Sequence, residues 1–142
     1  MTPLFDRIGG YETLNIVHKI FYDKVFKHPW LKHFFVERSQ ELLEIQQTKF
    51  MAGKMGTLNR YMGKAVQSTH QNMYVTEEIY ELRSVLLDES IKEFGINDEL
   101  RIEWMEINSL FQNAIIKKSE SDCTKAHSKQ RVFIIPKPFH LK

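Results

Sequence analysis

Residues 11–28, with the sequence YETLNIVHKIFYDKVFKH, decide the fold class of this chain. Apolar side chains recur every three or four residues along this stretch, at Leu14, Val17, Phe21 and Val25. This period places the four side chains on one face of an α-helix. The pattern stops at His28-Pro29, because the proline ring cannot continue a helix. We therefore predict a long helix with one buried face.

Helical periodicity also dominates the sequence on both sides of this stretch. Before it, a short helical turn ends at the pair Gly9-Gly10. After it, residues 30–35 are expected to form one or two helical turns. Ser39 is the expected N-cap of a further helix that ends near Gly53 or Gly56.

Two more helices are expected in the second half of the chain. Thr76 opens one that ends near Gly95, and Asn97 or Asp98 caps the last long helix. That last helix is predicted to bury one continuous stripe, formed by Leu100, Trp104, Ile107, Phe111 and Ile115. Strand signals are weak except at residues 131–135, RVFII. The predicted class is all-α.

Two stretches lack a helical pattern. Residues 54–69 form a long connection, of a kind that is either functional or loosely ordered, with a short helical turn around His70. Residues 119–130 are polar and are not expected to pack. The apolar segment after them either lies on the domain, or is a free end or a partner-binding peptide. We expect one domain over residues 1–118 and a tail over residues 119–142.

The composition excludes several classes of protein. The 142 residues suffice for one domain with a hydrophobic core, and a net charge of +2 does not favour nucleic acid or an anionic membrane as partner. The single cysteine, Cys123, cannot form an internal disulfide, which suits a reducing compartment. Neither a membrane span nor a signal peptide is recognisable. We expect a soluble, cytoplasmic protein.

His70 and three side chains at fixed distances before it carry the most chemical information. Gln47 precedes His70 by 23 residues, Phe35 precedes Gln47 by 12, and Tyr22 precedes Phe35 by 13. Taken alone, His70 would more often be a surface residue than a ligand. Together these residue types suit a haem site, in which a histidine binds iron and polar side chains hydrogen-bond a diatomic ligand across an apolar pocket. Tyr and Gln supply O–H and N–H donors, which stabilise partly negative dioxygen best at low dielectric.

Short phrases extend this hypothesis along the chain. They are LFDRIGG (4–10), FYDKV (21–25), FF (34–35), QTKF (47–50), YMG (61–63) and TH (69–70), followed by Val75 and Tyr80-Glu81. In order and spacing they resemble the truncated (2-on-2) haemoglobins, most closely the first of the three groups of that family. The resemblance extends from about Pro3 to Lys117. It implies a globin-like 2-on-2 helical sandwich with a C-terminal extension, and haem b (iron protoporphyrin IX) as cofactor.

The resemblance also assigns roles to residues at the iron. His70 matches the proximal iron ligand and is therefore the expected metal ligand. Tyr22 matches the donor to bound dioxygen, and Gln47 matches the residue that completes the distal hydrogen-bond network. These two are the candidate catalytic residues. Phe35 matches a side chain that wedges against the haem.

Further residues are expected to contact the cofactor. Leu43 matches the site where many globins carry a distal histidine, and a leucine there cannot hydrogen-bond a ligand. Phe50 matches a position that lines an apolar ligand tunnel. Lys64 and Arg60, in the loop expected at the haem edge, are candidates for pairing with the haem propionates.

The chain departs from the family pattern at two positions, and its tail beyond Lys118 has no counterpart in that pattern. Only one glycine, Gly56, follows the distal helix, where the family usually has two. Arg83 falls near a small or apolar distal position, and its side chain is expected to point either to solvent or to a haem propionate. Gln46 matches a position where some relatives coordinate the iron. Glutamine is a poor ligand, so an open or water-bound iron is expected.

Three functions follow from this sequence. A haem protein would bind dioxygen, nitric oxide and carbon monoxide for storage, delivery or sensing. An enzyme would convert dioxygen and nitric oxide to nitrate, which needs an external reductase because the chain has no flavin or nicotinamide module. The non-haem alternative is a helical interaction module that docks a partner through residues 132–139. The sequence does not predict an oligomeric state.

Overall fold

The computed structural model describes residues 2–57 and 66–141. In chain order its elements are α1 (Leu4–Ile8), α2 (Gly10–Lys27), the 3₁₀ turn η1 (Leu31–Phe35), α3 (Gln40–Lys54), α4 (Val66–His70), α5 (Glu77–Phe94), α6 (Asp98–Ser109), α7 (Gln112–Ile115) and the 3₁₀ turn η2 (Glu120–Asp122). None of these residues belongs to a named strand, so the all-α prediction is confirmed. No helix within the described ranges is long and apolar enough to span a bilayer.

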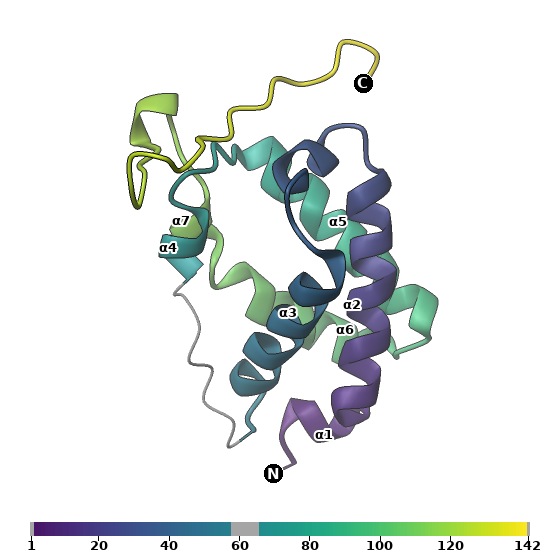
Figure 1. The fold of residues 1–142 in the computed structure, drawn as a ribbon. Helices are drawn as coiled ribbons and strands as arrows, with labels where there is room; N and C mark the ends of the chain where they lie inside the picture. The colour runs from purple at the N-terminus through teal and green to yellow at the C-terminus, as the bar shows by residue number, and fades with distance from the viewer. Residues whose placement is uncertain (1, 58–65, 142) are drawn as a thin grey trace.

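Two pairs of helices form the two layers of the fold (Figure 1). Helix α2 packs against α3 in one pair and α5 against α6 in the other, and contacts between α2 and α5 join the pairs. Helix α1 lies against α2 and α6, and the short α4 lies against α7. This arrangement is the 2-on-2 sandwich that the sequence predicts.

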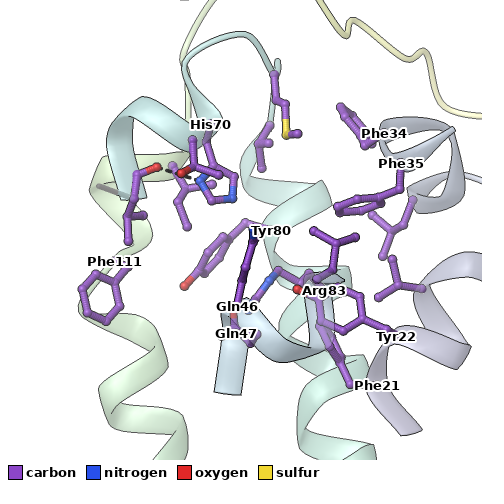
Figure 2. A pocket seen from close by; sticks show the side chains of 18 of the residues that line it. Phe21, Tyr22, Phe34, Phe35, Gln46, Gln47, His70, Tyr80, Arg83 and Phe111 are labelled. Atoms are coloured by element: carbon purple, nitrogen blue, oxygen red, sulfur yellow. Dashed lines mark hydrogen bonds between the residues drawn. The ribbon is translucent and has the colours of Figure 1, made fainter. Parts of the chain in front are cut away.

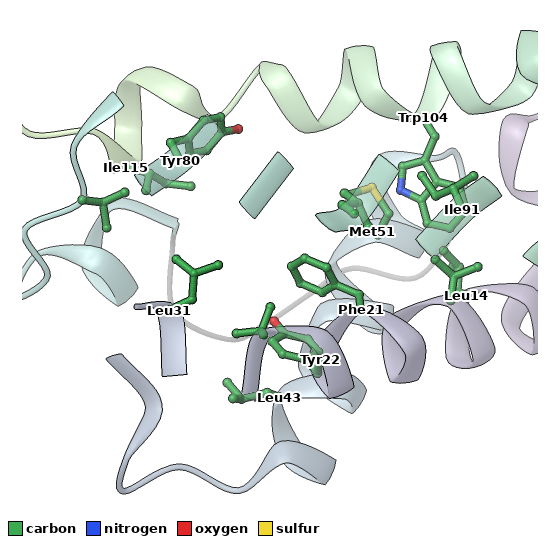
Figure 3. Packing of buried hydrophobic residues seen from close by; sticks show 14 of the residues in the cluster. Leu14, Phe21, Tyr22, Leu31, Leu43, Met51, Tyr80, Ile91, Trp104 and Ile115 are labelled. Carbon is green, nitrogen blue, oxygen red and sulfur yellow. The ribbon is translucent and has the colours of Figure 1, made fainter. Parts of the chain in front are cut away.

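The core between the layers is built from the apolar stripes of the four long helices. Leu14 and Phe21 of α2, Met51 of α3, Ile91 of α5 and Trp104 of α6 are each at most 1% exposed. Figure 3 shows Leu14, Ile91 and Trp104 gathered at one end of this cluster. Burial of each such side chain stabilises the fold by about 1.5–3 kcal/mol. The opposite end of the cluster is the part that borders a cavity.

Local polar contacts start and end the helices where the sequence predicts. Ser39, Thr76 and Asn97 are the N-caps of α3, α5 and α6, and each side chain accepts a hydrogen bond from the backbone N–H three residues later. Gly9 and Gly95 end α1 and α5 with φ angles of 108° and 101°. These angles lie in the left-handed region that favours glycine.

The last helix is interrupted, which corrects the prediction of one continuous helix. Helix α6 ends at Ser109, and α7 begins only at Gln112. The hydroxyl of Tyr80 on α5 donates a hydrogen bond to the backbone oxygen of Asn108 at 2.8 Å. In an uninterrupted helix that oxygen would accept from the N–H of Gln112. A contact from another element therefore competes with the helical bond at this turn.

The segment of residues 131–135 lies along the domain without forming a strand. The backbone N–H of Phe133 donates to the oxygen of Asn72 at 2.7 Å, and its own oxygen accepts from Tyr74 at 2.8 Å. The pairing is one isolated parallel bridge between Met73 and Phe133. The segment is therefore extended, but the strand that the sequence signal indicates does not form. Phe133 is 8% exposed, whereas Phe139 is fully exposed.

Residues 119–130 also touch the domain, although their polar sequence does not predict packing. The turn η2 lies in this stretch, and the N–H of Thr124 donates to the oxygen of Gln71 at 2.8 Å. The division of the chain into a domain of residues 1–118 and a tail of residues 119–142 stays a prediction.

The irregular stretch of residues 54–69 is described only at its two ends. Helix α3 extends to Lys54, and α4 is the short helical turn expected at His70. Lys64 and Arg60, the candidates for pairing with propionates, lie outside the described residues.

Candidate functional site

The end of the core opposite Trp104 (Figure 3) borders a pocket (Figure 2), and six of the seven residues predicted to contact the cofactor line it. The six are Tyr22, Phe35, Leu43, Gln47, Phe50 and His70. The seventh, Lys64, is outside the described residues. The remaining lining residues are mainly apolar: Phe21, Val25, Leu31, Phe34, Arg38, Gln46, Met51, Val66, Thr69, Met73, Val75, Ile79, Tyr80, Arg83, Asn108, Phe111 and Ile115.

The imidazole of His70 faces the pocket with one ring nitrogen committed to the backbone. Its Nδ1 lies 2.7 Å from the carbonyl oxygen of Val66, one turn earlier in α4. A carbonyl only accepts, so Nδ1 carries the proton and Nε2 keeps a lone pair. No described residue hydrogen-bonds Nε2. Burial lowers the pKa of His70 to about 4, which keeps the ring neutral at physiological pH.

The position of His70 also depends on a lysine that follows α7. The ammonium group of Lys117 donates to the carbonyl oxygens of His70 at 2.5 Å, Met73 at 2.7 Å and Ile115 at 3.3 Å. Carbonyl groups at the end of a helix lack donors within that helix. The ammonium group of Lys117 supplies the hydrogen-bond donors that α4 itself cannot. Sequence reasoning missed Lys117, because nothing in the local pattern links it to a carbonyl 47 residues earlier.

Tyr22 of α2 brings a hydroxyl group to the same pocket. The residue is 7% exposed, and burial raises the pKa of its hydroxyl, which therefore stays protonated. Its ring packs edge-on against Phe21 and Phe35, with centroids 4.9 and 6.4 Å away. Phe35 in turn stacks on Phe26 at 5.7 Å. The hydroxyl has no hydrogen-bond partner among the described residues.

Helix α3 contributes one wall of the pocket. Leu43, Gln47 and Phe50 lie on one face of this helix, as their spacing predicts. The amide of Gln47 is half-buried and has no partner within the described part of the chain. The ring of Phe50 packs edge-on against Phe111, with centroids 5.0 Å apart.

A further polar group on the wall is Arg83, whose side chain the sequence placed either towards solvent or at a haem propionate. Arg83 of α5 donates from Nη1 to the side-chain oxygen of Asn108 at 2.7 Å, and its guanidinium lies 5.2 Å from the ring centroid of Phe21. Both Tyr80 and Arg83 line the pocket, and they are three residues apart on one helix face. The side chain of Arg83 therefore lies at the pocket wall, held by Asn108, and does not simply extend into solvent.

These side chains suit a metal that arrives with a cofactor of its own. The described residues hold no cluster of three His, Cys, Asp or Glu side chains that could bind an ion directly. They do hold one neutral imidazole with a free Nε2, oriented by a carbonyl and facing apolar walls. Outer-shell orientation of this kind is usual for metal-binding histidines. The Nδ1 of His28 is already engaged, because it accepts hydrogen bonds from the backbone N–H groups of Trp30 and Leu31.

The sequence of the chain is similar to a globin family and to truncated haemoglobins. The bacterial-like globin family matches residues 3–117 of the chain. The group 1 truncated haemoglobin of Tetrahymena thermophila is 27% identical over 97 residues, which cover 68% of this chain and 80% of the relative. The group 1 truncated haemoglobin of Mycolicibacterium paratuberculosis is 29% identical over 96 residues, with coverages of 68% and 71%.

Solved structures of truncated haemoglobins share the fold of this chain. The truncated haemoglobin of Tetrahymena pyriformis in its Fe(III) form matches with a TM-score of 0.77 and 24% identity, over 82% of this chain and all of that chain. A truncated haemoglobin of Chlamydomonas reinhardtii matches with a TM-score of 0.70 and 26% identity, over 83% of this chain and 98% of that chain.

Proposed function

Because the chain belongs to the bacterial-like globin family, we propose that its pocket would hold haem b, with His70 as the residue that binds the iron. Membership of the family implies a haem cofactor and haem-based ligand binding. The free Nε2 of His70, directed at an apolar pocket, is the observation that supports the assignment of the ligand. When bound, haem would supply an iron able to bind dioxygen, nitric oxide or carbon monoxide.

His70 performs its part as a neutral, oriented base. The hydrogen bond from Nδ1 to Val66 fixes the tautomer and the direction of the ring. The lowered pKa of about 4 means that no proton has to leave Nε2 before it coordinates a metal at neutral pH. The three carbonyl bonds of Lys117 hold the end of α4 that carries the ring.

Tyr22 and Gln47 would donate hydrogen bonds to a ligand at the other side of the pocket. Each has a donor that no described residue uses, and each lies in a pocket lined mainly by apolar side chains. A donor held at low dielectric stabilises a ligand atom that carries partial negative charge. The raised pKa of Tyr22 keeps its donor proton in place. We infer that dioxygen binds reversibly and leaves slowly, which suits storage, delivery or sensing.

Phe35, Leu43 and Phe50 form an apolar part of the pocket wall. Leu43 is 9% exposed, and the rings of Phe35 and Phe50 are fixed by stacking on Phe26 and by an edge contact with Phe111. An apolar wall strengthens every hydrogen bond that Tyr22 and Gln47 offer. A pairing of Lys64 with a propionate stays part of the proposal, outside the described residues.

Haem uptake tests this function directly. Mixed with haemin and reduced with dithionite, the protein is expected to give a five-coordinate ferrous spectrum and, in air, a stable oxygenated one. His70→Gly should lose the haem on gel filtration and regain it with added imidazole, whereas His33→Gly, at an exposed histidine, should behave as the wild type. Retention of haem by His70→Gly without imidazole would overturn the assignment. Nitrate formed on adding nitric oxide to the oxygenated protein would add a dioxygenase activity.

A further inference from the structure

Arg83 places a positive charge on the pocket wall that the haem function does not require. Its Nη1 donates to the side-chain oxygen of Asn108 at 2.7 Å, and its guanidinium lies 5.2 Å from the centroid of Phe21. Figure 2 shows Arg83 on the same side of the pocket as Tyr22, Gln46 and Gln47, away from His70. The charge therefore stands where a small ligand would meet the distal donors.

Nothing on the described part of the wall neutralises this charge. Asn108 is neutral, so its hydrogen bond holds the guanidinium in place without balancing it, and the face of Phe21 adds a weaker attraction. None of the described lining residues is Asp or Glu, while a second guanidinium, that of Arg38, also lines the pocket. The charges of Arg83 and Arg38 also act on Tyr22. Each lowers the pKa of Tyr22 by more than the charge of Glu44 raises it.

Arg83 also has donors to spare. A guanidinium carries five N–H donors in a planar fork, and a single hydrogen bond joins Arg83 to a described residue. An oxyanion can accept two parallel N–H bonds from such a fork, and a charge-assisted bond is about twice as strong as a neutral one. Asn108 is 5% exposed, so the fork is anchored from behind by a buried side chain.

We propose that Arg83 makes this pocket selective for a small monovalent anion, with a planar oxyanion such as nitrite as the class that fits the fork. This inference rests on the proposed haem function, because the anion would bind on the side opposite His70. Arg83 acts here as a specificity-determining residue, with Asn108 as its positioning residue.

Equilibrium binding to the ferric, haem-loaded protein tests the proposal. Dissociation constants for nitrite and for azide are measured from the absorption spectrum, and carbon monoxide binding to the ferrous protein is the neutral reference. Arg83→Leu should weaken both anions by about tenfold or more, since it removes charge-assisted bonds, and should change carbon monoxide binding by less than about threefold. The anion affinities of Arg83→Lys should lie between those of the wild type and Arg83→Leu, because lysine keeps the charge and loses the planar fork of donors.

A control variant distinguishes a local role of Arg83 from a general effect of charge, and the rate of haem loss distinguishes it from a contact with a propionate. Arg131→Leu removes an equal charge from an exposed position and should leave anion binding unchanged. If Arg83→Leu binds nitrite and azide within twofold of the wild type, the proposal is overturned. If that result comes with faster haem loss, Arg83 belongs to a propionate instead. Failure of the wild type to take up haem would overturn the haem function as well, and the two failures are therefore distinguishable.

Discussion

At the scale of single residues, the two tyrosines of the pocket differ in what their hydroxyl groups do. The hydroxyl of Tyr80 is used within the fold, since it donates to the backbone oxygen of Asn108 at 2.8 Å. The hydroxyl of Tyr22 has no partner among the described residues. A buried donor without a protein partner costs free energy unless a ligand satisfies it. Tyr22 is therefore available to a ligand in a way that Tyr80 is not.

This difference predicts the kinetics of dioxygen release. Tyr22→Phe removes a donor worth about 1–3 kcal/mol when buried, so dioxygen should leave roughly tenfold to a hundredfold faster. Stopped-flow displacement of dioxygen by carbon monoxide measures the rate. Tyr80→Phe is the matched control and should change it by less than about threefold, because its hydroxyl is already engaged. Equal rates in the wild type and Tyr22→Phe would show that Tyr22 does not reach the ligand.

The residue types of the site were predictable from the sequence, but the direction of Arg83 was not. His70, Tyr22, Phe35 and Gln47 were singled out by their residue types and their fixed separations in the sequence, and the structure places them around one pocket. Their roles stay proposals. Arg83 turns inward because Asn108 and Phe21, distant in sequence, hold its guanidinium. No local pattern contains that information.

At the scale of elements, α4 is too short to be stable alone. It has five residues, and isolated helices shorter than about 12–15 residues are marginal in water. The contacts that hold it come from later in the chain. Lys117 donates to the carbonyl of His70, and Thr124 and Phe133 donate to the carbonyls of Gln71 and Asn72 just beyond it. The element that carries the proposed iron ligand is thus fixed by the C-terminal part of the molecule.

Lys117→Met should loosen this element while keeping the length of the side chain. We expect haem loss to accelerate about tenfold, equivalent to roughly 1.4 kcal/mol, because three charge-assisted bonds disappear and their carbonyls are partly exposed to water. Transfer of haem to an excess of a haem-scavenging apoglobin measures the rate. Lys118→Met, at the exposed neighbouring lysine, is the control. A rate equal to that of the control would remove Lys117 from the support of His70.

Some helix boundaries are set by side chains nearby in the sequence, and others by contacts from distant elements. The N-caps Ser39, Thr76 and Asn97 depend on side chains that bond backbone groups three residues away, so the sequence predicts them. The interruption between α6 and α7 depends on the Tyr80 hydroxyl from another helix, and the sequence misses it. The extended path of residues 131–135 fails as a strand for a related reason, since Met73 offers it only one bridge.

At the scale of the whole molecule, one buried histidine at the contact between α2 and α3 links stability to pH. His18 is fully buried, and its Nδ1 lies 2.7 Å from the hydroxyl oxygen of Thr48. Within the described residues its Nε2 has no partner, and neither has Nε1 of Trp104, whose ring stands at 90° to it with centroids 6.1 Å apart. Burial, assisted by the charge of Arg83, lowers the pKa of His18 from 6.5 to about 3. The fold therefore accepts only the neutral ring.

The sign of the effect follows from which state binds the proton. Between about pH 6.5 and pH 3 the unfolded chain protonates His18 and the folded protein does not, so the free energy of unfolding falls as the pH falls through this window. The contribution of one such group is about 1.4 kcal/mol per pH unit, and it is absent above about pH 6.5. His18→Gln stays neutral at every pH and can still bond Thr48, so it should flatten this part of the stability curve. Urea unfolding at pH 7, 6 and 5 measures both slopes, and because His70 and His28 are present in both proteins, their titration cancels in the difference. Parallel curves would mean that the α2–α3 contact opens enough in solution to hydrate a charged His18, and the packing of the core around Trp104 would then be looser than its burial indicates.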